Sequence, residues 1–167
     1  MKTIIRPVAV LAVALGALAG GTAPLASQQP SPDPKVLLET MRNNVDRIMP
    51  SLENMRWTEN VKLWQARLDH PGALDRATRA AMQNSLDSIT SIVEQIKAPD
   101  ERGRWEANRD LWKFLIAESG APSPATLANM KATYKAMREN VAKITAPGEE
   151  QRWKANCDLW KGALGVK

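Results

Sequence analysis

A Trp-rich decapeptide occurs three times in this chain at a fixed spacing, and this recurrence constrains the fold more than any other feature. The sequence reads "RWTENVKLWQ" at 56–65, "RWEANRDLWK" at 104–113 and "RWKANCDLWK" at 152–161, so the copies are 48 residues apart. All six Trp residues of the chain lie in these copies, beside one Phe and one Tyr elsewhere. A fixed period of this size indicates an array of similar structural units.

Alignment of 41–68, 89–116 and 137–164 without gaps gives eight identical columns. Two columns precede the Trp-rich segment and six fall within or just before it. The identical residues are Val45, Val93 and Val141; Ile48, Ile96 and Ile144; Glu53, Glu101 and Glu149; Arg56, Arg104 and Arg152; Trp57, Trp105 and Trp153; Asn60, Asn108 and Asn156; Leu63, Leu111 and Leu159; and Trp64, Trp112 and Trp160. The chain therefore contains internal copies of one unit.

Each unit has the pattern of two helices. The first half carries apolar residues at spacings of 3, 4 and 3, which is typical of a helix that packs on a neighbour. A Pro follows (Pro50, Pro99 and Pro147), and Pro suits the first turn of a new helix. Gly and Pro after the Trp-rich half indicate where that second helix ends. The first helix is expected to be longer in the second and third units, since 72–97 has no breaker after Gly72.

We therefore predict an all-α fold of three tandem helical hairpins, six helices in all, that form a short solenoid or a bundle. The units span about 35–72, 73–121 and 122–167 of a single domain at 35–167. The period is close to that of HEAT-type helical pairs and longer than the roughly 34 residues of TPR units. This likeness concerns architecture alone, and architecture does not define function.

The N-terminal segment has the layout of a secretory signal. Lys2 and Arg6 precede an apolar run from Val8 to Ala19, and small residues follow. We predict a signal peptide at 1–27 and a Pro-rich lead-in at 28–34, which would place the protein in the periplasm or outside the cell. Retention of the segment as an uncleaved membrane anchor is the alternative, because the apolar stretch is nearly long enough to span a bilayer.

Six of the identical columns fall on one stripe of the second helix, about 120° wide. Two interpretations of its polar members differ in function. In the first, Glu and Arg three residues apart pair along the helix, Asn binds backbone of an adjacent element, and the indoles donate to Glu or a carbonyl, which makes a buried clasp. In the second, the stripe is an open face that binds a partner, a glycan, a pigment or another small molecule. The candidate residues are Trp57, Trp64, Trp105, Trp112, Trp153, Trp160, Arg56, Arg104, Arg152, Asn60, Asn108, Asn156, Glu53, Glu101 and Glu149.

Candidates for catalysis and cofactor binding are poor. His70 is the single His and lies in a "DHPG" loop with no nucleophile beside it. Cys157 is the single Cys, in a variable column, and is expected to be partly exposed and able to form an intermolecular disulfide. The sequence has no CxxC, HExxH, CxxCH, GxGxxG or P-loop, so we expect no metal, no cofactor and no enzymatic activity.

The charge pattern argues against nucleic acid as a partner. The net charge is +5, and without the two basic residues of the leader it falls to +3 (21 basic, 18 acidic). Basic and acidic residues are interspersed, whereas nucleic-acid binding needs a basic patch. The sequence thus favours an exported, non-enzymatic interaction or scaffold protein whose partner is another protein. One specific form is an extrinsic periplasmic subunit of a respiratory or photosynthetic membrane complex, and a periplasmic or secreted binder of a small molecule, pigment or glycan is the alternative.

Overall fold

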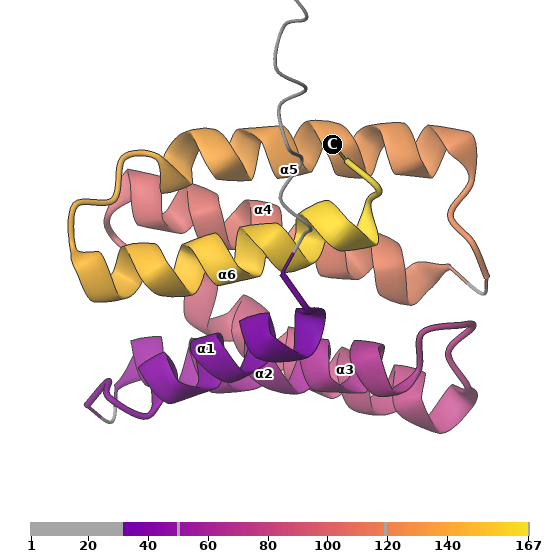
Figure 1. Cartoon of the computed structure of the whole chain (residues 1–167), viewed down its shortest axis with the longest axis horizontal. Helices are drawn as coiled ribbons and strands as arrows, with labels where there is room; N and C mark the ends of the chain where they lie inside the picture. The colour runs from indigo at the N-terminus through magenta and orange to yellow at the C-terminus, as the bar shows by residue number, and fades with distance from the viewer. Residues whose placement is uncertain (1–31, 50, 119, 167) are drawn as a thin grey trace, which may run out of the picture.

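The computed structural model describes residues 32–49, 51–118 and 120–166, which contain six α-helices and no strand. The prediction of an all-α fold is confirmed for this part of the chain (Figure 1). The predicted leader at 1–27 and most of the lead-in lie outside the described residues, as does Pro50. The helices are α1 (Pro34–Val45), α2 (Leu52–Asp69), α3 (Arg76–Val93), α4 (Pro99–Ala117), α5 (Pro124–Val141) and α6 (Pro147–Ala163).

Capping residues explain where these helices begin. Pro99 and Pro147 occupy the first turns of α4 and α6, where Pro loses no intrahelical hydrogen bond. The Ser51 hydroxyl caps α2 instead, because it accepts a hydrogen bond from the backbone N–H of Asn54 at 3.2 Å. Acidic residues in the first turn of all three Trp-bearing helices complement the positive helix end.

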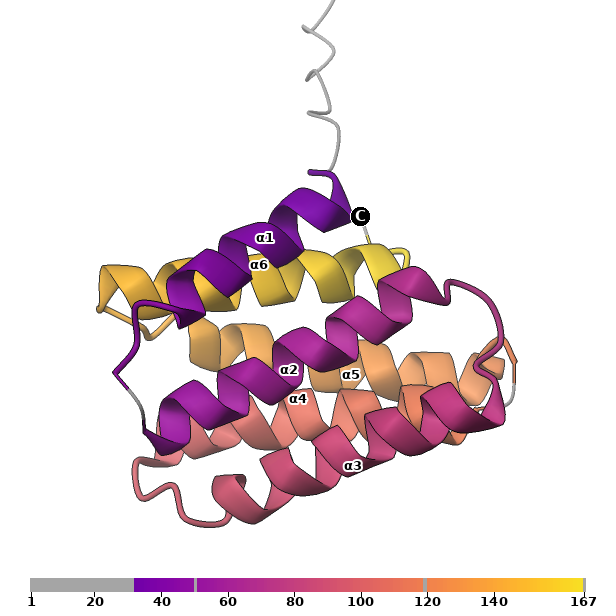
Figure 2. The same ribbon diagram turned by 90° about the horizontal axis from the view of Figure 1, so that it is seen from below.

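Three inner helices (α2, α4, α6) are surrounded by three outer helices (α1, α3, α5). Each outer helix packs against two inner ones: α1 against α2 and α6, α3 against α2 and α4, and α5 against α4 and α6. Figure 2 shows α1 beside both α6 and α2, so the first and last helices are neighbours and the contacts close into a ring. No two Cα atoms from different inner helices lie within 8 Å of each other, so the inner helices contact one another through their side chains.

One outer helix is shorter than its counterparts. The helices α3 and α5 have 18 residues each and begin 48 residues apart, at Arg76 and Pro124, whereas α1 has 12 residues. The expectation of longer first helices in the second and third units is therefore correct. At the same register α1 would begin at position 28 (76 − 48), but Pro32 and Asp33 are not helical and α1 begins at Pro34. Among the described residues, an outer helix therefore covers the groove between α2 and α6 over a shorter length than it does the other two grooves.

None of the described helices combines enough length with enough hydropathy to cross a bilayer.

Candidate functional site

The three Asn side chains of the predicted stripe form a closed ring of hydrogen bonds at the centre of the bundle. Asn60 Nδ2 donates to Asn156 Oδ1, Asn156 Nδ2 to Asn108 Oδ1, and Asn108 Nδ2 to Asn60 Oδ1, each at 3.0 Å. All three residues are 0% exposed. Each inner helix is thus tied to the other two through one amide. The expectation that these amides bind backbone of an adjacent element is wrong.

Three indoles extend this ring. The Nε1 atoms of Trp64, Trp112 and Trp160 donate to Oδ1 of Asn156, Asn60 and Asn108, at 2.8, 2.9 and 2.8 Å. Their ring centroids lie 4.6–4.7 Å apart, with the rings tilted or edge-on to one another. Each Asn oxygen therefore accepts one amide and one indole hydrogen, so the buried amides and these indoles satisfy one another.

A second set of three indoles lies seven residues, or about two helical turns, closer to the start of the inner helices. Trp57, Trp105 and Trp153 make pairwise T-shaped contacts with centroids 4.9–5.1 Å apart. Arg56 lies over the ring of Trp105, and Arg104 and Arg152 lie over Trp153 and Trp57 in the same way, at 5.3–5.8 Å from the centroids. Cation–π contact thus directs each guanidinium toward the next inner helix.

The Arg–Glu ion pairs also connect different helices. Arg104 Nη2 binds Glu149 Oε1 at 2.6 Å, and Arg152 Nη2 binds Glu53 Oε1 at 2.6 Å. Arg56 binds Glu101 in the equivalent way. The expected pairing of Glu and Arg along one helix is therefore wrong. The indoles hold the inner helices apart, so an Arg that lies across its neighbour's ring reaches the Glu of that neighbour and not its own.

The fifteen predicted site residues are all buried or half-buried. Every Trp of the stripe is 0–1% exposed, the three Asn and three Arg residues are buried, and the three Glu residues are half-buried at the rim. In this closed arrangement the six indoles are shielded from solvent. The stripe therefore acts as a buried clasp that holds the inner helices together. The Nε atoms of the three Arg residues and Nε1 of Trp153 are buried without a hydrogen-bond partner among the described residues.

The two residues considered for chemistry lie in different environments. His70 is exposed at the C-terminal end of α2. Cys157 is only 6% exposed, and this burial raises the pKa of its thiol to about 12, so the expectation of partial exposure is wrong. Within the described residues, no group of three or more His, Cys, Asp or Glu side chains could hold a metal ion.

An exposed apolar patch occurs in the first unit, and sequence reasoning missed it. Met49, Leu52 and Met55 are 79%, 45% and 54% exposed, where α1 ends and α2 begins. We call these three residues the tip patch. The same columns hold polar or small residues in the other units: Lys97, Asp100 and Gly103 in the second, and Thr145, Gly148 and Gln151 in the third. A comparison of variable columns, in place of identical ones, would have revealed this difference.

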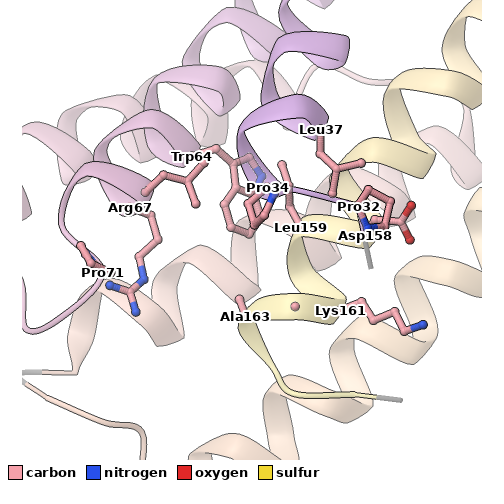
Figure 3. A pocket seen from close by; sticks show the side chains of 12 residues that line it. Pro32, Pro34, Leu37, Trp64, Arg67, Pro71, Asp158, Leu159, Lys161 and Ala163 are labelled. Carbon is pink, nitrogen blue, oxygen red and sulfur yellow. The ribbon is translucent and has the colours of Figure 1, made fainter. Parts of the chain in front are cut away.

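A cavity of about 660 Å³ lies between the start of α1 and the last turns of α2 and α6 (Figure 3). Its wall is mainly apolar and includes Pro34, Trp64 and Leu159. Arg67 from α2 and Lys161 from α6 stand on opposite sides of it. We call this space the α1 cavity, and it lies beside the start of the short α1.

Comparison of the chain with protein families, curated proteins and solved structures found no match. The three units of the chain can instead be compared with one another. A residue that differs from its counterparts in the other two units indicates a feature that is specific to its own unit.

Proposed function

We propose that this protein is an exported, non-enzymatic interaction protein that docks on another protein through the tip patch. The observation that carries this proposal is the exposure of Met49, Leu52 and Met55, at columns where the other two units hold polar or small residues. Leaving a Leu or Met side chain exposed forgoes about 1.5–3 kcal/mol relative to full burial. The second and third units form equivalent helices with polar or small residues at these columns, so the fold does not require the patch.

The internal organisation of the chain supports a specialised first unit. We infer that the three units are tandem copies, since eight columns are identical at a spacing of 48 residues. The identical residues hold the bundle together, and selection for this role keeps them alike. Residues that differ between the units are then candidates for a functional surface. Exposed apolar residues that occur together are typical of a surface that contacts another protein.

The predicted signal peptide places this docking in the periplasm or outside the cell. A specific form of the proposal is an extrinsic subunit held on the outer side of a membrane complex of the respiratory or photosynthetic type. Its support is the predicted leader, together with the described helices, which pack on one another. The alternative, a binder that uses the repeated Trp, Arg and Asn face, has less support, because its indoles are buried.

The test exchanges the tip patch for the residues of the other units. A Met49→Lys, Leu52→Asp, Met55→Gln variant is expected to fold as the parent does, because all three side chains are exposed. Gently solubilised membranes of the source, separated by native electrophoresis, should show the parent chain in a large assembly and the variant released from it. Mass spectrometry of the chain's N-terminal peptide in the same run reports whether the leader was removed.

A matched control changes two of the equivalent positions in the third unit. Thr145→Lys with Gln151→Lys alters two exposed positions and should leave the assembly intact. If the parent chain migrates only as a small free species, or if the tip-patch variant stays in the assembly, the docking proposal is wrong.

A further inference from the structure

We propose that Met49 and Met55 form a modification site, at which oxidation by a hydroperoxide makes the tip patch polar and releases the docked protein. This inference rests on the docking function proposed above and adds its regulation. It is carried by the placement of the sulfur atoms, because exposed Met side chains occur, within the described residues, only in the tip patch.

The Met residues of the chain fall into two classes of exposure. The chain has seven, and six of them lie in the described part. Met49 and Met55 are 79% and 54% exposed. The other four are 0–1% exposed, and they are Met41, Met82, Met130 and Met137. A peroxide must collide with the sulfur atom to oxidise it, so these four can react only when the bundle opens. Both sulfur atoms that are accessible in the folded part therefore belong to one patch.

The single thiol of the chain does not compete for the oxidant. Cys157 is buried, and this burial raises the pKa of its thiol to about 12. The thiolate is the form of Cys that reacts with a peroxide, and at neutral pH this thiol stays protonated. We therefore expect peroxide to leave Cys157 reduced while the two exposed Met residues react.

The fold requires neither of these two Met side chains. The equivalent columns of the other units hold Lys97, Gly103, Thr145 and Gln151. Among the described residues, the core and the half-buried side chains packed against it include neither Met49 nor Met55. A change of polarity at these positions should therefore weaken docking and leave the bundle folded.

The oxidation transfers one oxygen atom from the hydroperoxide to the sulfur of Met. A lone pair of the sulfur attacks one peroxide oxygen, so that the S–O bond forms and the O–O bond breaks. The sulfur loses two electrons, and the proton on the transferred oxygen passes to the leaving oxygen, which departs as water when the oxidant is hydrogen peroxide. The product is a polar sulfoxide in place of an apolar thioether, and this change disrupts interfaces that contain Met.

Mass spectrometry tests the modification site by itself. Protein purified from the source is treated with hydrogen peroxide, and the sulfoxide at each Met is followed over time. Oxidation at Met49 and Met55 should be at least about 10-fold faster than at the four buried Met residues, with an unchanged thermal melting curve. Equal rates at the exposed and the buried residues would overturn the proposal.

Rebinding to membranes tests the regulation of docking. Oxidised and untreated protein, both freed of peroxide with catalase, are added to membranes from source cells that lack the chain, and native electrophoresis measures the share in the assembly. Untreated protein should join the assembly, and oxidised protein should bind at least about 10-fold more weakly. If untreated protein joins no assembly, the docking function is wrong and its regulation falls with it. If both forms bind equally, only the regulation is wrong.

Variants assign the effect to these two sulfur atoms. The Met49→Leu, Met55→Leu variant has no sulfur in the tip patch, so its binding after peroxide should equal its own binding before. Met49→Gln with Met55→Gln carries polar side chains and should bind at least about 10-fold more weakly than the parent without any peroxide. Val36→Gln is the matched control, because it removes an exposed apolar side chain of α1 outside the tip patch and should bind as the parent does. Release of the Leu variant by peroxide would place the oxidised group elsewhere and contradict the proposal.

Discussion

Replacement of Trp112 by Ala is expected to lower the stability of the folded protein severely. The indole is 0% exposed, contacts Trp64 and Trp160 with ring centroids 4.6 Å away, and donates its Nε1 hydrogen to Asn60. Truncation of a buried Trp costs roughly 3–5 kcal/mol. Total stabilities of domains are only about 5–15 kcal/mol, so this loss is a large fraction of the free energy of unfolding. Urea unfolding followed by circular dichroism measures it.

Phe114→Ala is the matched control for this truncation, since it removes an aromatic ring two residues away on the same helix. Phe114 is half-buried and packs at the edge of the core, so its removal should cost about 1–2 kcal/mol. If Trp112→Ala is no more destabilising than Phe114→Ala, the Trp residues are not the clasp of the bundle.

Replacement of Asn108 by Leu is the second large effect. Leu has a similar volume but accepts no hydrogen bond, so Trp160 Nε1 and Asn156 Nδ2 both lose their acceptor. Each buried donor left unsatisfied costs about 1–3 kcal/mol, which gives roughly 2–6 kcal/mol for the pair. The free energy of unfolding in urea, with the slope of the transition unchanged, reports this loss.

Asn84→Leu provides the comparison for that change, because Asn84 is exposed on α3 and its replacement should alter stability by less than about 0.5 kcal/mol. An Asn108→Leu protein as stable as the Asn84→Leu protein would show that the amide ring contributes nothing to the fold.

The helices and their buried stripe could be predicted from sequence because both are local properties. Apolar spacing of three and four residues predicts the outer helices, and the Pro and acidic residues predict the starts of α4 and α6. The position of Asn60 in the middle of a stripe with two indoles predicted a polar contact inside an aromatic core. The buried clasp was one of the two interpretations of this pattern, and the burial of its Trp and Asn residues agrees with it.

The partners within the clasp could not be predicted, because they lie on other units. Asn60 binds Asn156 and Asn108, which are 96 and 48 residues away, and Arg104 binds a Glu 45 residues away. Local spacing favoured a Glu–Arg pair on one helix. The size of six indoles at the centre sets the distance between inner helices, and that distance decides which Glu each Arg can reach. Helical periodicity contains no information about this separation.

The contact between α1 and α6 was equally hidden from sequence. Identical residues in each unit suit an open solenoid as well as a closed ring, since both bury the same stripe against a neighbour. In a closed ring the last unit contacts the first, and in an open solenoid it does not. In this structure Arg152 of α6 pairs with Glu53 of α2, so the ring is closed. The tip patch and the α1 cavity lie in columns where the units differ, and the columns that are identical in all three units contain no information about them.

The most direct test of the closed clasp is hydrogen exchange at the six indole N–H groups, followed by NMR on the native protein. Trp64, Trp112 and Trp160 are buried and donate to Asn oxygens, so their indole hydrogens should exchange only through global unfolding. Their exchange free energies should equal the free energy of unfolding from urea. Rapid exchange of these three hydrogens in a protein that is otherwise folded would contradict the closed bundle and would restore the open Trp face as a binding surface.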